Sequence, residues 1–275
     1  MSRKKVIVIV GATGVLGSSI AEKFTDSDAE LVLTCSTRNK IKLLKGSMTE
    51  VVDVTSDKSV KNFFKKVQIR YKKIDVLITA FGVYGSIGLL SDIDPRRWEN
   101  AINVNLFGNV KCFYYAIPLL KKSKNGKIIT FAGGGEGAKP NFTSYVSSKM
   151  AVVRLIETLG EELKDNNIDV NAISPGPIKS RFTEDIIKAG AKLAGKKSFD
   201  EAKEQMSGRK ETVDPKLIAN LVEFLSSSDS DGITGKNISA VHDPWRDFSN
   251  HKKDIINSKV YTFHRIKPKE EGYDW

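Results

Sequence analysis

Short runs of β-branched residues alternate with longer segments of helical periodicity from the start of this 275-residue chain. Such alternation is typical of a parallel sheet whose connecting helices cover both faces. The expected strands are Lys5–Val10, Glu30–Thr34, a short run before Asp53, Asp75–Ala80, Lys127–Ala132, Asp169–Ile173 and Asn237–Val241. The expected helices are Ser18–Phe24, Lys58–Tyr71, Asp94–Lys121, Ser144–Lys164, a broken region over Thr183–Ser207 and Pro215–Ser226. This pattern predicts one doubly wound α/β domain.

Composition limits the classes of partner. Hydrophobic residues make up 40% of the chain, enough for a full core, but no apolar run approaches the length of a membrane span. The apolar run Val6–Val10 leads straight into glycines, so we interpret it as a buried strand and not as a signal peptide. The net charge is +11, yet the cations are spread between acids at helical spacing, which is typical of a solvated surface. We therefore expect neither nucleic acid nor a membrane as partner.

The cysteines and histidines are too scattered to form a site. Cys35 and Cys112 lie far apart in apolar segments, and the three histidines all fall near the C-terminus. This spacing predicts no disulfide framework and no metal site, and it is typical of a reducing, cytoplasmic setting.

A glycine trio follows the first expected strand. Gly11, Gly14 and Gly17 stand directly before the helix that is expected to open at Ser18. In this context the first glycine allows a sharp turn, the second allows the backbone to approach a pyrophosphate, and the third allows close packing of helix and strand. The amide groups of the helix N-terminus then face the anion. The alternative is a tight strand-to-helix turn without a ligand. The predicted cofactor contacts here are Gly11, Thr13, Gly14, Val15, Leu16 and Gly17.

The residues after the second strand address the choice of cofactor. Sites for NAD place an acidic residue here, which holds the ribose hydroxyls and repels a 2′-phosphate. This chain has no acid between Cys35 and Lys40; Ser36 can donate a hydrogen bond and Arg38 can clamp a phosphate. NADP(H) is therefore favoured over NAD(H). Alternatively, Arg38 and Lys40 simply begin the next helix and face water.

Tyr145 and Lys149 form the sharpest pair of polar residues. Their i,i+4 spacing places the phenol and the ammonium on one helical face. A neighbouring cation favours the phenolate, so we expect Lys149 to lower the pKa of Tyr145. A tyrosine tuned in this way can exchange a proton with a carbonyl or alcohol oxygen during hydride transfer. The alternative is an ordinary pair on the protein surface.

With these motifs the chain resembles the short-chain dehydrogenase/reductase family over about residues 4–241. The resemblance implies a single Rossmann-type domain with a seven-stranded parallel sheet in the order 3-2-1-4-5-6-7, and hydride transfer between a nicotinamide and an alcohol or carbonyl. It implies a catalytic domain at 1–241, a substrate lid at 181–212 and a C-terminal extension at 242–275. The catalytic residues that it implies are Tyr145 as proton donor, Lys149 as its ribose-binding partner and Asn105 as support for a water relay. The further cofactor contacts that it implies are Asp53, Val54, Ala80, Phe81, Gly82, Pro175, Gly176 and Ile178.

One departure from the family pattern bears on catalysis. The family's catalytic serine should fall at Ala132 or Gly133, where this chain has no hydroxyl. Losing a comparable transition-state donor costs roughly 2.7–4 kcal/mol. In one interpretation, backbone groups of Gly133 and Gly134, or a hydroxyl such as that of Ser144, contact the substrate instead. In the other, the protein is a catalytically impaired NADP(H)-binding sensor or scaffold.

The substrate and the assembly are indicated only coarsely. The glycine run and the catalytic pair resemble a subgroup linked to surface-glycan synthesis, and the cation-rich lid would suit a sugar-derived or phosphorylated small molecule. Alternatively, the lid lysines line a solvated face. The family resemblance implies a homodimer or homotetramer. In the C-terminal extension, Trp245, Tyr261, Phe263 and Trp275 suggest packing on the body or on a neighbouring subunit.

Overall fold

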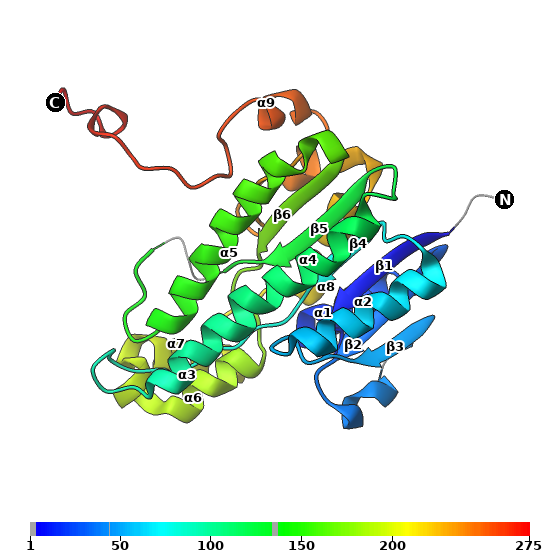
Figure 1. Cartoon of the computed structure of the whole chain (residues 1–275). Helices are drawn as coiled ribbons and strands as arrows, with labels where there is room; N and C mark the ends of the chain where they lie inside the picture. Colours follow the sequence, from blue (N-terminus) through cyan, green and yellow to red (C-terminus); the bar gives the residue numbers. More distant parts are fainter. Residues whose placement is uncertain (1–3, 44, 134–136) are drawn as a thin grey trace.

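The computed structural model describes residues 4–43, 45–133 and 137–275 and shows one parallel sheet between two helical layers (Figure 1). The strand order is β3-β2-β1-β4-β5-β6-β7, and every neighbouring pair is parallel. The strands are β1 (Lys5–Val10), β2 (Ala29–Cys35), β3 (Met48–Val51), β4 (Val76–Thr79), β5 (Gly126–Phe131), β6 (Ile168–Ser174) and β7 (Asn237–Ser239). The fold predicted from the sequence is confirmed.

Alternation along the strands builds two separate cores. In β1, Val6, Val8 and Val10 face the first core, and Ile7 and Ile9 face the second. Helices α2, α4 and α5 cover the first face, and α1 and α8 cover the second. The helices are α1 (Val15–Lys23), α2 (Asp57–Tyr71), α3 (Pro95–Ile102), α4 (Gly108–Leu120), α5 (Thr143–Glu162), α6 (Arg181–Ala194), α7 (Lys196–Ser207), α8 (Pro215–Ser226) and α9 (Lys252–Ile256). Within the described ranges, none of these helices has the length and hydropathy to traverse a lipid bilayer.

The expected helix over Asp94–Lys121 is not continuous. A π-helical segment, Asn103–Phe107, separates α3 from α4. The carbonyl of Asn105 at its centre accepts a hydrogen bond from the Asn109 side chain at 2.6 Å, and the Asn105 side chain is buried. Insertions of this kind commonly mark functional sites. The predicted helix is present over Pro95–Leu120, but the π-helical insertion within it was not predicted.

The region between β6 and α8 is the broken helical segment that the sequence predicts. Gly190 has a φ of +77° and interrupts α6, and Gly195 at φ +79° separates α6 from α7. Both are conformations that favour glycine. The helix breaks in this segment therefore occur at glycines.

The C-terminal extension is packed on the body over most of its length. Trp245 and Phe248 belong to the core under α8, and Phe263 packs on the core under α5. The last residues differ, since the Trp275 side chain is 83% exposed. Figure 1 shows the chain end leading away from the domain. Packing on the body is thus confirmed for Trp245, Tyr261 and Phe263, whereas Trp275 makes no such contact.

Candidate active site

The glycine turn has the shape that a pyrophosphate cradle needs. Gly11 has a φ of +92°, and a Cβ there would stand 2.8 Å from the Ala80 carbonyl oxygen. A Cβ on Gly17 would stand 2.2 Å from the Gly11 oxygen, so close packing excludes any side chain. At Gly14 the nearest atom would be 3.7 Å away, and the residue is exposed. Packing therefore requires glycine at two positions and leaves the third open toward the crevice, where no side chain caps the start of α1.

The residues predicted to bind the adenosine end lie at the carboxyl ends of β2 and β3. Ser36 and Arg38 are exposed, and Arg38 begins a 3₁₀ turn over Arg38–Leu43. Asp53 is exposed, and its Oδ1 accepts hydrogen bonds from the amide (2.9 Å) and hydroxyl (2.7 Å) of Thr55. The Asp53 carboxylate thus stabilises a turn in this structure and still faces solvent. Val54 packs on the first core and meets Gly108.

Tyr145 and Lys149 lie on α5 against the end of β5. The Lys149 side chain is buried, and its Nζ donates a 2.7 Å hydrogen bond to the Phe131 carbonyl. Burial lowers the pKa of Lys149 to about 8 and raises the pKa of Tyr145 to about 12. The expectation that the ammonium lowers the tyrosine pKa is wrong for this structure. The amine lies 5.9 Å from the phenol ring centroid and bonds to a carbonyl, so desolvation of the phenol prevails.

Asn105 holds the neighbouring loop in place. Its Oδ1 accepts from the Val83 amide at 2.9 Å, and its Nδ2 donates to the Val83 carbonyl at 2.8 Å and to the Ser148 hydroxyl at 2.9 Å. A Cβ on Gly82 would lie 3.3 Å from Asn105 Oδ1 and 3.6 Å from Lys149 Nζ. Gly82, Asn105 and Lys149, which were predicted from separate motifs, therefore lie next to one another. The water relay predicted for Asn105 stays a prediction.

The position of the absent serine is partly described. Gly133 has a φ of +103°, and a Cβ there would stand 3.6 Å from the Tyr145 hydroxyl and 3.5 Å from Pro175. Gly134 lies outside the described residues, so its substrate contact stays a prediction. Ser144 is fully buried, and its hydroxyl donates to the carbonyls of Tyr84 and Ser86 at 2.8 and 3.3 Å. Two backbone carbonyls thus engage the Ser144 hydroxyl, and its substrate contact stays a prediction.

The remaining predicted contacts surround the same crevice. Ala80 and Phe81 follow β4 and, like Gly82, are partly exposed; the Ala80 amide bonds to the Val10 carbonyl at 2.8 Å. After β6, Pro175 and Ile178 are partly exposed and Gly176 is exposed, with a φ of +77°. All of these lie where parallel strands end, which is the edge at which open α/β sheets bind ligands.

An aromatic cluster around Tyr145 escaped the sequence analysis. The Tyr84 ring lies 4.7 Å from Tyr145, 4.7 Å from Phe182 and 5.2 Å from Phe142, between ring centroids. Arg181 donates a 2.9 Å hydrogen bond to the Gly82 carbonyl, so the start of α6 lies across the crevice. These residues come from three distant segments, and no local pattern connects them.

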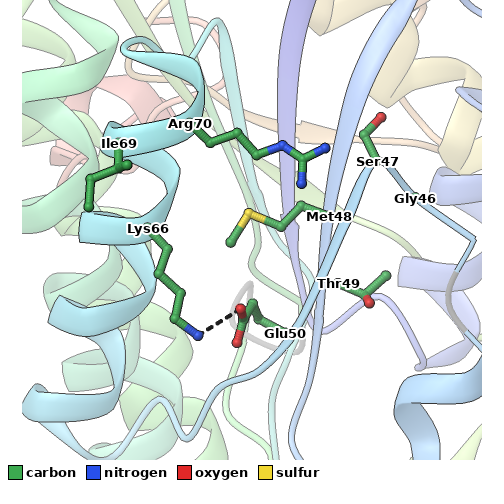
Figure 2. Close-up of a pocket in the computed structure, with 8 residues that line it drawn as sticks. All are labelled: Gly46, Ser47, Met48, Thr49, Glu50, Lys66, Ile69 and Arg70. Carbon is green, nitrogen blue, oxygen red and sulfur yellow. Dashed lines mark hydrogen bonds and ion pairs between the residues drawn. The ribbon is translucent and has the colours of Figure 1, made fainter.

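A groove between β3 and α2 lies away from these residues (Figure 2). It has a volume of about 450 Å³ and runs between β3 and α2, where Lys66 pairs with Glu50 at 2.7 Å. Its lining residues are Gly46, Ser47, Met48, Thr49, Glu50, Lys66, Ile69 and Arg70. None of them is a predicted site residue, and the groove is open to solvent along the sheet edge. This groove therefore has no part in the predicted chemistry.

Comparisons with known proteins agree with this geometry. Residues 11–241 match the family model described as Enoyl-(Acyl carrier protein) reductase. The 3-oxoacyl-[acyl-carrier-protein] reductase FabG of Thermotoga maritima is 30% identical over 84% of this chain and 94% of its own. A diacetyl reductase [(S)-acetoin forming] of Staphylococcus epidermidis is 29% identical over 85% of this chain and 96% of its own.

Two solved structures are similar as well. NAD⁺-bound xylitol dehydrogenase superposes with a TM-score of 0.78 at 25% identity, covering 87% of this chain and 98% of that chain. A variant of actinorhodin polyketide ketoreductase with NADPH has a TM-score of 0.78 at 22% identity, covering 86% of this chain and 95% of that one; this likeness shows the fold alone.

Fold, site and relatives define a nucleotide-dependent oxidoreductase of the Rossmann type. The chain belongs to the short-chain dehydrogenase/reductase family. It is an NAD(P)-dependent oxidoreductase acting on CH–OH groups.

Proposed function

We propose that this protein is an NADP(H)-dependent reductase or dehydrogenase that interconverts a carbonyl and an alcohol, with Tyr145 as proton donor and acceptor. The observation that carries the proposal is the convergence of Tyr145, Lys149 and Gly133 at the carboxyl end of β5. They lie on the crevice side that also holds the glycine turn. The lid role of residues 181–212 is part of the same proposal.

The described residues fit a dinucleotide. The open backbone at Gly14 and the uncapped start of α1 suit a pyrophosphate. Ser36 and Arg38 are exposed beside them, without an acid that would repel a 2′-phosphate, which supports a preference for NADP(H). The nicotinamide supplies or accepts the hydride when bound.

The proton chemistry suits carbonyl reduction. With a pKa near 12, Tyr145 holds its proton at neutral pH and can donate it to a substrate oxygen. Lys149, with a pKa near 8, is mostly protonated at pH 7 and places a positive charge beside the phenol. Asn105 holds the loop after β4 against this pair.

The surroundings of Tyr145 favour an uncharged carbonyl group. The rings of Tyr84 and Phe182 pack on the Tyr145 ring, and Phe142 packs on Tyr84. Of the lid cations, Lys196 pairs with Asp200 at 2.7 Å and Lys188 and Lys192 are exposed. Arg181 is bonded to the Gly82 carbonyl. This arrangement favours the solvated-face interpretation of the lid over a phosphorylated substrate. The sugar-derived alternative stays a prediction.

Self-association belongs to the proposal too. Phe107, Val110 and Tyr114 are exposed at helical spacing along the end of the π segment and α4. An apolar stripe of this kind supports the homodimer or homotetramer that the family resemblance implies. Size measurement in solution would test it.

The proposed function is tested by following NADPH and NADH oxidation with diacetyl, an acetoacetyl thioester and a keto sugar. We expect turnover with NADPH that Tyr145→Phe reduces by at least about 10²-fold without weakening NADPH binding. Tyr114→Phe, an exposed tyrosine on α4, is the matched control. Tight NADPH binding without oxidation of any carbonyl would favour the sensor or scaffold alternative.

A further inference from the structure

The segment Ser258–Phe263 of the C-terminal extension is tied to the body by main-chain hydrogen bonds. Lys236 Nζ donates to the Ser258 carbonyl at 2.8 Å and to the Val260 carbonyl at 3.1 Å. The amide of Asn237, the first residue of β7, donates to the Tyr261 carbonyl at 2.8 Å. The segment thus crosses the start of β7 in a fixed register.

The same segment ends on α5, the helix that carries Tyr145 and Lys149. The Phe263 amide donates to Glu157 Oε1 at 2.7 Å, and Arg154 Nη2 donates to the Phe263 carbonyl at 2.8 Å. Arg154 and Glu157 also form an ion pair with each other. The two side chains of this ion pair therefore hold the carbonyl and the amide of a single residue, Phe263.

Fixing this backbone positions the Phe263 ring at a small void that Gly133 and Lys149 also line. The ring packs on the core under α5 and borders a small void behind Lys149. The void has no room for a water molecule. Its other lining residues are Ala132, Gly133, Lys149, Met150, Val153, Ser174 and Asn237. Phe263 therefore lines, together with Lys149, a void that admits no water.

We propose that residues 258–263 are a positioning element for the active site, in which Phe263 keeps water from the rear of Lys149 and holds its amine toward Phe131 and the crevice. The inference rests on the proposed role of Lys149, and it assigns to the C-terminal extension a part in that site. Phe263 is a positioning residue and not a catalytic one, because it acts through Lys149.

The groups that face Lys149 explain why exclusion of water matters. On α5 the titratable neighbour is the Tyr145 phenol; β5 offers the Phe131 carbonyl, and the π segment offers the Asn105 amide. The lid contributes Phe182 and the Arg181 guanidinium, which is bonded to the Gly82 carbonyl. The Arg154–Glu157 pair lies further along α5 and binds Phe263. No carboxylate among the described residues is hydrogen-bonded to Lys149, so dry packing governs the pKa of its amine.

The experiment is an NMR titration of lysine ¹³Cε signals in the full-length protein, with the Lys149 signal assigned through Lys149→Arg. We expect a midpoint near pH 8 in the parent protein. Phe263→Ala should shift it upward by about one pH unit, because water gains access to the amine. Phe263→Leu, which keeps an apolar filling, should restore most of the parent value. Ile266→Ala, at an exposed position three residues further on, is the matched control and should change nothing.

An unchanged Lys149 midpoint in folded Phe263→Ala would overturn the proposal, as would an equal shift in Ile266→Ala. If Phe263→Ala does not fold, Lys236→Met replaces it, since it removes the two tethers on Ser258 and Val260; a smaller upward shift supports the proposal and no shift overturns it. The titration needs no substrate. Absence of turnover in every assay would therefore refute the proposed function and leave this result standing.

Discussion

One lysine is buried near the amino end of β5 and another near its carboxyl end, and the two have opposite surroundings. Lys127 lies toward the amino end of β5 and Lys149 packs against its carboxyl end, and both are 3% exposed. Lys127 Nζ lies 2.6 Å from a carboxylate oxygen of Asp169 and 2.6 Å from one of Asp231. Lys149 has only the Phe131 carbonyl within hydrogen-bond distance among the described residues.

This difference separates a structural lysine from a reactive one. The ion pairs of Lys127 with Asp169 and Asp231 join β5 to β6 and to the turn before β7. A buried amine without a carboxylate has a lowered pKa and keeps its remaining donors for a ligand. Burial alone therefore does not mark the active site. Lys149 differs from Lys127 in having no carboxylate partner among the described residues and in lying beside Tyr145.

The largest expected effect on stability comes from replacing Lys127, near the amino end of β5. Lys127→Met removes the cation and leaves the Asp169 carboxylate buried with only the Gly232 amide as a described partner, at 3.1 Å. Breaking a buried pair in this way lowers the free energy of unfolding by roughly 3–5 kcal/mol. Urea denaturation followed by circular dichroism measures it. A loss below about 1 kcal/mol, the value of an exposed pair, would remove the distinction between the two edges.

The second prediction concerns the pH dependence of stability at the carboxyl edge. The pKa of Lys149 is near 8 in the folded protein and near 10.5 in the unfolded chain, so the unfolded state binds more protons between these values. The parent protein should therefore gain stability relative to Lys149→Met as the pH rises from 8 to 10, by about 2 kcal/mol.

Denaturation at pH 7, 8, 9 and 10 measures this gain. The range stays below the raised pKa of Tyr145 in the folded state. If the free energy of unfolding changed equally with pH in the parent and in Lys149→Met, Lys149 would titrate normally. The proposed difference between Lys149 and Lys127 would then be wrong.

The smallest predicted effect is on cofactor choice at the ends of β2 and β3. Arg38→Glu places an acid where the chain now has an exposed cation, so it should weaken NADPH binding about tenfold or more, or at least ~1.4 kcal/mol, and spare NADH. Fluorescence titration with both cofactors measures it. Lys40→Glu, two residues further along the same exposed turn, is the matched control. Equal losses for both cofactors would contradict the assignment of Arg38.

The local patterns of the sequence predicted the fold and the polar centre of the site. Strand alternation, the glycine turn and the i,i+4 spacing of Tyr145 and Lys149 are local signals, and each has a direct physical cause. The aromatic cluster was not predictable, because Tyr84, Phe142 and Phe182 meet only through the fold. The π segment at Asn105 and the pKa of Tyr145 depend on tertiary hydrogen bonds and burial. Neither can be obtained from the spacing of residues along one helix.

The most direct test of this account is the turnover of Lys149→Met and Lys127→Met, measured side by side with NADPH and the best carbonyl substrate at 25 °C. The account predicts that Lys149→Met loses as much as about 10⁴-fold while remaining folded. Lys127→Met, assayed well below its midpoint of unfolding, should keep turnover within a few-fold of the parent. Full activity in Lys149→Met, or an equal loss in both variants, would contradict it.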